Sequence, residues 1–296
     1  MSSSVADEDL SLSSTFASLL TAVRRDDAAA ARALVCAEPH ALVATAEDGA
    51  SALSTAALEG SVGMTRLLLE LGADVRARAH DGATALSVAC AVGRADVAAL
   101  LLAHGAAVNP PCQLFTPLHE AAAAGHVECT RMLLRADARL EASDCWWGTP
   151  LHLACHRGHP GVVRLLLERG ARPCARMVHK TALHYAVERC AAASSAYDGG
   201  GRSSAQALEV VDLLLRHGAS RLARDNSGRT PLELAMCHPW SNPRARARLR
   251  ARLELPDHSP LNLRRICELK LLRSFTQKQL RDMNMPASTR NPLLMQ

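Results

Sequence analysis

Residues 149–171, TPLHLACHRGHPGVVRLLLERGA, contain the pattern that decides the fold. Thr149 can cap the start of a helix with its side-chain oxygen, and Pro150 suits the first helical position. The leucines at 165–167 give a second helix its buried face, and Gly170 can take the positive φ that ends this helix. The stretch therefore predicts two short helices joined by a turn. One such unit cannot bury its own apolar face, so it must stack on copies of itself.

Five further copies of this pattern occur in the chain. Counted from the residue that aligns with Thr149, the six copies start at 51, 84, 116, 149, 181 and 230. The intervals between them are 33, 32, 33, 32 and 49 residues. Leucine-rich triplets and Gly-Ala pairs follow in phase, but the third copy is broken at Ala136-Asp137, where the glycine is missing. The long final interval contains an insertion at 191–206, AAASSAYDGGGRSSAQ.

These units resemble the ankyrin repeat, and their period matches it. The resemblance implies an all-α solenoid of six to seven helix-turn-helix repeats over residues 16–241. The clear repeats span 48–241, and a degenerate unit precedes them. Residues 1–15 include six serines, and we predict that they are disordered. We also predict no fixed structure for the glycine-rich insertion at 191–206.

The C-terminal end of the chain is basic. Alternate positions from Arg244 to Arg252 are arginine, within a segment at 242–258 that we predict to be a basic linker. Alternating Arg and Ala also forms an ordinary solvated helix, and we favour that interpretation over nucleic-acid binding or nuclear import. Only 3% of the residues are aromatic, which disfavours a surface that stacks nucleotide bases.

A second pattern lies at 259–296. Asn262 is a good N-cap, and it is followed by apolar residues at helical spacing. This apolar stripe consists of Leu263, Ile266, Cys267 and Leu271. The run resembles the elongin-binding box that opens a SOCS box. The resemblance therefore implies a helical SOCS box over 259–296.

Repeats followed by such a box are similar to the ankyrin repeat and SOCS box family. In that family the repeats hold a target protein, and the box recruits elongin C, elongin B and cullin-5 with its RING partner. The resemblance implies that the stripe residues contact elongin C, and that Met285 and Pro286 lie toward the cullin. It implies a non-catalytic receptor that brings a target protein to ubiquitination and proteasomal degradation. The alternative is an ankyrin scaffold that binds a partner without degrading it, with the box serving only as a structural cap.

Target contacts are expected from the turns and first helices of the repeats, on the concave side of an ankyrin stack. Trp is a preferred interface anchor, and two of the three Trp residues lie together in one turn. The candidate target-binding residues are Trp146, Trp147, Arg76, Arg78, His80 and Arg157. The sequence does not name the target.

No catalytic, metal or cofactor site is predicted. Phosphate-loop and nucleophile-elbow signatures are absent, and the ten Cys residues include no C-x-x-C pair. His152, Cys155 and His156 are close in sequence, but His152 belongs to the repeat motif, so we interpret them as structural. No apolar run reaches about 18 residues, and the N-terminus lacks the features of a signal peptide. These patterns predict an intracellular protein without a membrane span, with the cytoplasm as the expected compartment and the nucleus as the alternative.

Overall fold

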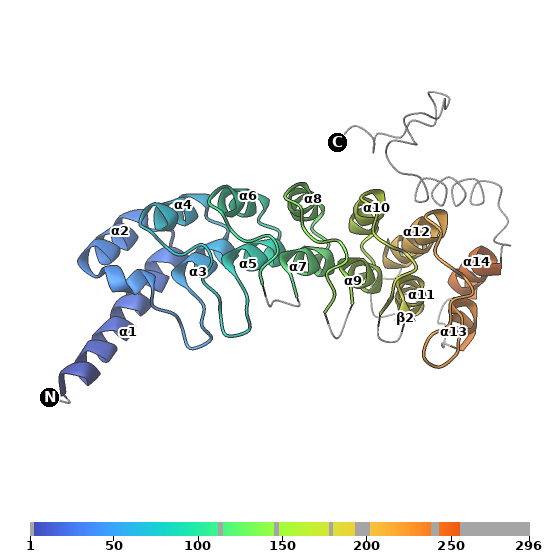
Figure 1. Cartoon of the computed structure of the whole chain (residues 1–296), viewed down its shortest axis with the longest axis horizontal. Helices are drawn as coiled ribbons and strands as arrows, with labels where there is room; N and C mark the ends of the chain where they lie inside the picture. The colour runs from blue at the N-terminus through green and yellow to red at the C-terminus, as the bar shows by residue number, and fades with distance from the viewer. Residues whose placement is uncertain are drawn as a thin grey trace, which may run out of the picture.

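The computed structural model describes residues 3–111, 115–144, 148–177, 180–192, 202–237 and 243–254. Figure 1 shows an elongated row of short helices. The elements are α1 (Ser3–Arg24), α2 (Ala28–Ala37), the 3₁₀-helix η1 (Pro39–Leu42), α3 (Ala52–Glu59), α4 (Val62–Glu70), α5 (Ala85–Val92), α6 (Ala95–Ala103), α7 (Pro117–Ala124), α8 (Val127–Arg135), α9 (Pro150–Arg157), α10 (Pro160–Glu168), β1 (Arg176–Met177), β2 (Lys180–Thr181), α11 (Ala182–Ala192), α12 (Arg202–Arg216), α13 (Pro231–Cys237) and α14 (Pro243–Glu254).

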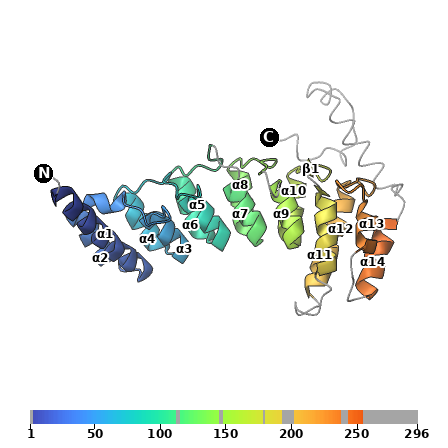
Figure 2. The same ribbon diagram turned by 90° about the horizontal axis from the view of Figure 1, so that it is seen from below.

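In the described ranges the helices form seven pairs, which follow one another in chain order from α1–α2 to α13–α14 (Figure 2). We call the first helices of the last six pairs the inner helices: α3, α5, α7, α9, α11 and α13. From α3 to α13 each inner helix contacts the next, and from α4 to α12 the second helices do the same in a separate layer. The turns between pairs project on the side of the inner helices (Figure 1). This arrangement confirms the predicted all-α solenoid.

The motif residues end and begin helices as the sequence predicts. Thr149 is the N-cap of α9, and its side chain forms a capping box with His152. Pro150 occupies the first turn, where its missing N–H leaves no helical hydrogen bond unmade. Gly158 ends α9 at a φ of 79°. A Cβ at this glycine would lie 3.2 Å from the Arg189 side chain, so both the backbone angle and the packing favour Gly.

The leucine triplets of the second helices supply the core. The middle residue of every triplet is at most 1% exposed, whereas its neighbours are less completely buried in most copies. These middle residues are Leu68, Leu101, Leu133, Leu166 and Leu214. The middle leucines belong to one hydrophobic cluster with buried residues of the inner helices. Hydrophobic burial is therefore continuous along the stack, as a solenoid requires.

The third copy ends its second helix without glycine. Asp137 occupies the position held by Gly72, Gly105, Gly170 and Gly218 in the other copies, and it has a φ of 58°. Asp is one of the few residues other than Gly that tolerate this left-handed region. The backbone path of the repeat is therefore retained despite the substitution.

The predicted disorder of residues 1–15 is wrong, because α1 extends from Ser3 to Arg24. Its second half is anchored by Phe16, Leu19 and Val23, each at most 5% exposed. Once such a packed segment is helical, extending the helix adds one hydrogen bond for each residue fixed. The pair α1–α2 is the degenerate first unit that the sequence analysis expected.

The insertion is shorter than predicted. Residues 191 and 192 continue α11, and residues 202–206 belong to α12, so helix replaces structureless chain at both ends of 191–206. Cys190 stands where the first four copies have their helix-ending Gly, and α11 continues past it. Residues 193–201 lie outside the described part of the chain.

The segment predicted as a basic linker at 242–258 contains α14, which packs on the stack. Ala245, Leu249 and Leu253 are at most 6% exposed, and they lie four residues apart on one face of the helix. The Arg252 Nε donates to Asp212 Oδ1 of α12 over 2.6 Å. The packing was not predicted because the five arginines dominate the charge of the segment, although the three buried apolar residues share one face. The solenoid therefore continues to Glu254.

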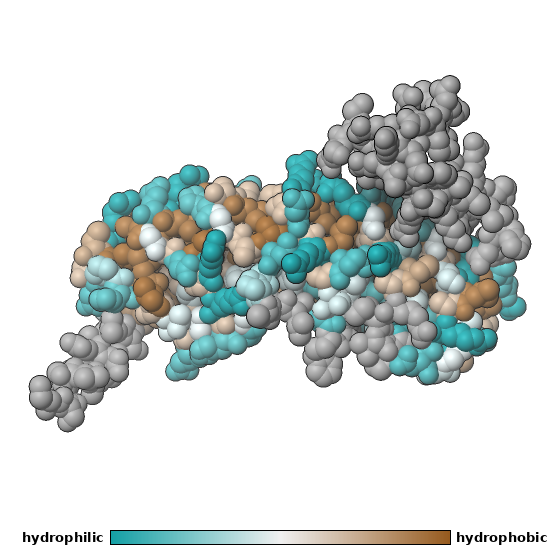
Figure 3. Space-filling model, viewed as in Figure 1, coloured by the Kyte–Doolittle hydropathy of each residue, from teal (hydrophilic) through white to brown (hydrophobic). Residues whose placement is uncertain are grey.

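On the face of the molecule drawn in Figure 3, the hydrophobic residues are confined to part of the surface. Figure 3 shows a band of hydrophobic residues over α4, α6 and α8, bordered by hydrophilic residues along the edges of the stack. The larger apolar residues that remain exposed in the described chain are few, led by Val43 at 82% and Leu222 at 74%. No described helix combines the length and the hydrophobicity needed to cross a membrane.

Candidate protein-binding surface

The histidines of the repeat motif join successive repeats. In α9 the Thr149 backbone N–H donates to His152 Nδ1 over 3.3 Å, and His152 Nε2 lies 3.1 Å from the Ala175 carbonyl oxygen. This pairing requires a proton on Nε2 and none on Nδ1. The imidazole ring of His152 is therefore neutral. Burial lowers the pKa of His152 to about 4. His119 and His184 make equivalent contacts to Gly148 and Arg229.

These contacts make a zinc site at His152, Cys155 and His156 chemically unfavourable. Both ring nitrogens of His152 are committed to hydrogen bonds within the stack. Cys155 is completely buried, and burial raises the pKa of its thiol, which opposes formation of the thiolate that zinc needs. Among the described residues, no group of three or more His, Cys, Asp or Glu is placed to hold a metal ion.

The inner helices leave one side open. Counted from the N-cap, the seventh residue is not fully buried in any inner helix, and the eighth is likewise open in α3 to α11. The fourth residue is open in α5, α7 and α11 and buried in α3, α9 and α13. Equivalent positions of stacked helices share a face, so these residues form one continuous strip, which we call the inner strip. Its members are Leu58, Glu59, Val88, Ala91, Val92, Glu120, Ala123, Ala124, His156, Arg157, Tyr185, Glu188, Arg189 and Cys237.

Tyr185 is the largest side chain of the inner strip, and the sequence analysis missed it. Its ring meets His156 edge-on at 5.7 Å between centroids, and Lys180 Nζ lies 5.8 Å from its centroid. Lys180 also reaches Glu188 Oε1 over 2.5 Å. These neighbours contact the ring, and a partly exposed Tyr is a typical interface anchor. The signal was its position four residues after the cap, where Val88 and Glu120 are also open.

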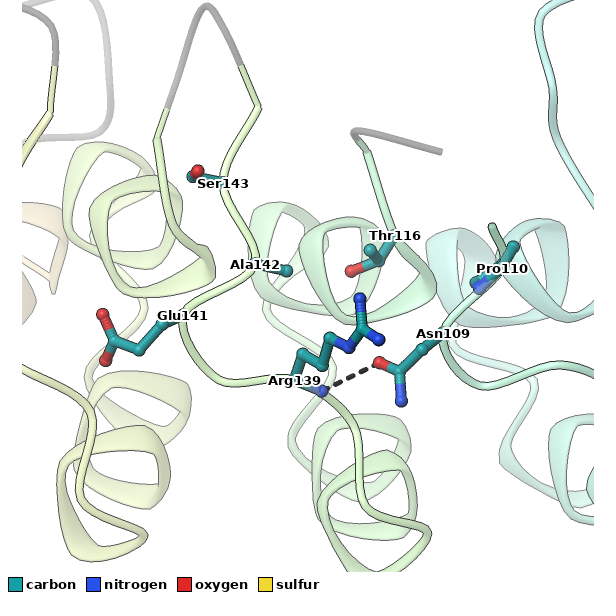
Figure 4. A pocket seen from close by; sticks show the side chains of 7 residues that line it. All are labelled: Asn109, Pro110, Thr116, Arg139, Glu141, Ala142 and Ser143. Carbon is teal, nitrogen blue, oxygen red and sulfur yellow. Dashed lines mark hydrogen bonds between the residues drawn. The ribbon is translucent and has the colours of Figure 1, made fainter. Parts of the chain in front are cut away.

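The turns are tied to one another by side chains. Asn109 Oδ1 accepts the Arg139 backbone N–H over 2.9 Å, and Asn109 Nδ2 donates to the Asp137 carbonyl (Figure 4). One turn further on, Glu141 Oε1 accepts the backbone N–H of Arg172. A shallow hollow of about 420 Å³ lies beside Asn109, Arg139 and Glu141. Such links fix the spacing of the turns and preorganise them for a partner.

The structure separates the predicted target-binding residues. Arg76, Arg78 and His80 lie in the turn before α5, and all three are exposed. The Arg78 Nη2 donates to the Pro111 carbonyl of the next turn over 2.8 Å, so this side chain has a structural partner. Arg157 lies at the C-terminal end of α9, two repeats further along and on the inner strip. These four residues therefore do not form one cluster.

The remaining predicted sites lie outside the described residues. Trp146 and Trp147 belong to the gap at 145–147. The proposed elongin contacts Leu263, Ile266, Cys267 and Leu271, and the cullin contacts Met285 and Pro286, follow the last described residue. The assignments of these six residues and of the tryptophans remain predictions from sequence.

Comparison with known proteins agrees with the geometry. Models of ankyrin repeats match residues 73–144 and 118–195, and a single-repeat model matches 48–80 and 179–226. No curated protein matched the sequence. Among solved structures, the crystal structure of the human ASB11 ankyrin repeat domain is similar, with 28% identity and a TM-score of 0.66. The match covers 80% of this chain and 98% of the ASB11 chain. The helix pairs, the motif contacts and these matches together show that the chain belongs to the ankyrin repeat proteins.

Proposed function

We propose that the chain is the substrate-recognition subunit of an elongin B/C–cullin-5 ubiquitin ligase. In this proposal the ankyrin repeats bind the target protein, and residues 259–296 recruit the ligase. The chain performs no bond chemistry. It raises the effective concentration of target lysines near the ubiquitin-carrying enzyme, which is a contribution of proximity alone.

The observation that supports the proposal most is the way in which α14 closes the stack. The face of α14 toward the repeats carries Leu249 and Leu253, and its exposed residues include Arg244, Arg248 and Arg250. A terminal repeat with a polar outer face is what a solenoid needs for solubility. A further cap is therefore unnecessary, which weakens the alternative that the C-terminal box serves only to cover the last repeat.

Two further observations agree with the receptor role. The capping residue, Leu263, Cys267 and Leu271 keep the spacing of an elongin-binding box. The ankyrin part is similar to the human ASB11 ankyrin repeat domain. Ankyrin repeats by themselves support protein binding, and the combination with the box supports a ligase receptor.

Copurification with elongins tests the proposal. The full chain is coexpressed with elongins B and C, and complex formation is measured by size-exclusion chromatography. We expect the wild type to co-elute with both elongins, and Leu263→Asp with Cys267→Asp to abolish co-elution, because a charge in an apolar contact is strongly unfavourable. The matched control is Val43→Asp with Leu222→Asp, which adds the same charges at exposed positions of the repeats.

Cullin binding separates the receptor from the scaffold. Cullin-5 with its RING partner is added to the purified elongin complex, and Met285→Ala with Pro286→Ala is compared with the wild type. The receptor proposal predicts binding that this double substitution weakens. Elongin binding without cullin binding would favour the non-degradative scaffold, and binding of neither by a folded chain would overturn the proposal.

A further inference from the structure

The N-terminal part of the inner strip is mostly apolar, and Glu59 of α3 is its one charged member. Leu58 of α3 is 49% exposed and Val92 of α5 is 39% exposed, and Val88 is partly exposed between them. On α7 the positions equivalent to Val92 and its neighbour are Ala124 and Ala123. Most large apolar residues of the described chain are buried, so adjacent exposed Leu and Val on one face are notable. This part of the strip suits apolar side chains of a partner.

The C-terminal part of the inner strip is basic. Arg157 ends α9, and Arg189 lies at the equivalent position of α11. Glu188 beside them is paired with Lys180, so this carboxylate and this ammonium offset each other. The pKa of His156 is lowered first by burial and then by the positive charge of Arg157, while the negative charge of Glu188 acts in the opposite direction. A negatively charged partner group would be favoured here.

Glu120 marks the boundary between these two parts. It lies on α7 at the position equivalent to Val88 and Tyr185. Burial raises the pKa of its carboxyl group, and the negative charge of Asp81 in a neighbouring turn raises it further. An acidic side chain placed over α7 would be repelled by these two carboxylates. Acidic groups of a partner are therefore directed to α9 and α11, beyond Glu120.

We propose that the inner strip binds a target segment that is apolar at one end and acidic at the other. The apolar end lies over α3 and α5, and the acidic end lies over Arg157 and Arg189. This inference rests on the proposed function, in which the repeats hold the target. Packed helices are about 10 Å apart, so α3 to α11 spans roughly 40 Å. An extended segment of roughly 12 residues covers that distance.

The test uses two fluorescent model peptides of equal length and the full-length protein. One peptide joins a leucine-rich block to a glutamate block, and the other joins the same block to a lysine block. Each is made in both block orders, since the direction of the bound chain is open. Binding is measured by fluorescence anisotropy. We expect the better Leu–Glu peptide to bind about 10-fold more tightly than either Leu–Lys peptide.

Two substitutions place the binding on the inner strip. Arg157→Glu should remove most of the preference for glutamate, because it reverses one of the two charges at the basic end. The double substitution Leu58→Ser with Val92→Ser should weaken the binding of every peptide that the wild type binds. The matched control is Arg135→Glu, which makes the same charge change at an exposed position of α8, away from the inner helices.

Three results would overturn the inference. They are equal or tighter binding of a Leu–Lys peptide, an unchanged preference in Arg157→Glu, and absence of binding by every peptide. Circular dichroism of each variant shows whether the repeats remain folded. Elongin copurification does not involve the inner strip, so failure of this inference leaves a positive elongin result intact. Failure of the elongin test equally leaves the peptide result interpretable.

Discussion

The fifth helix pair, α9–α10, and the last pair, α13–α14, occupy equivalent positions in the repeat and have different sequences. In α9–α10, His152 joins the repeat to the Ala175 carbonyl of the next turn, and Leu166 is completely buried. In the last pair, Glu233 occupies the motif position of His152, and it accepts the Thr230 backbone N–H over 2.7 Å. The second helix, α14, buries Leu249 among arginines.

This difference shows which features a repeat in this stack needs. A capped first turn is required, and either a neutral His or an ionised Glu can complete the cap. The second helix needs apolar residues on one face, and Ala245, Leu249 and Leu253 meet that need in α14. The other positions of α14 are open to arginine, because their charged groups reach water while their stems cover the helix. Net charge is therefore a poor guide to whether such a segment packs.

The largest effect is expected in the regular pair. Leu166→Ala should lower the free energy of unfolding by about 4 kcal/mol, because the residue is enclosed on both sides and the cavity cannot collapse. Urea denaturation followed by circular dichroism measures this change. Leu222→Ala, at a site that is 74% exposed, serves as the control and should change stability by less than about 0.5 kcal/mol. A loss below about 1 kcal/mol for Leu166→Ala would contradict the assignment of the middle leucine to the core.

A smaller effect is expected at the end of the stack. Leu249→Ala should cost about 2 to 3 kcal/mol, because α14 packs on the repeats from one side and the site can relax. Hydrogen exchange should show the loss mainly in α14 and α13, since a solenoid unit interacts with its neighbours alone. Arg248→Ala, at an exposed position of the same helix, is the control. Unchanged exchange in Leu249→Ala would mean that α14 is the solvated linker predicted from composition.

Acid should distinguish the two pairs by their capping residues. The pKa of His152 is lowered to about 4, so the unfolded chain binds the proton first as pH falls below 6.5. The stability that the neutral His152 ring contributes is therefore complete above pH 6.5 and is lost as the pH falls toward 4. About 2 kcal/mol of it is lost at pH 5. The pKa of Glu233 is also lowered, chiefly because its carboxylate accepts the Thr230 N–H. The stability that Glu233 contributes is lost only as the pH falls below 4.5, the ordinary pKa of a Glu side chain.

Hydrogen exchange at pH 7 and pH 5, corrected for the intrinsic pH dependence of exchange, measures this difference. We expect α9 to lose protection at pH 5 while α13 keeps it. His152→Gln should reduce the pH dependence of α9 and leave that of α13 unchanged. Equal loss of protection in both helices would contradict the role assigned to the neutral His152 ring.

Several structural features could be predicted from particular residues. Thr149 and Pro150 predicted the start of α9, and the leucine triplet predicted the buried face of α10. The first and last residues of a helix could not be predicted where the sequence lacks a capping residue, a proline or a leucine triplet. Serine-rich composition hid α1, and arginine-rich composition hid the packing of α14, because both depend on a few apolar residues that are buried on one face. Tyr185 was missed for a related reason, since its prominence comes from being left uncovered by the neighbouring helices.

The sequence alone determined the repeat period, the caps, the leucine core and the family, because these depend on local backbone chemistry and on spacing along one helix. Only the tertiary structure decided which side of the inner helices stays open, where the last packed helix ends, and how Arg157, Tyr185 and Arg189 come to share one strip. These features depend on distances between residues of different repeats. Stacking fixes those distances, and the order of residues in a single repeat does not contain them.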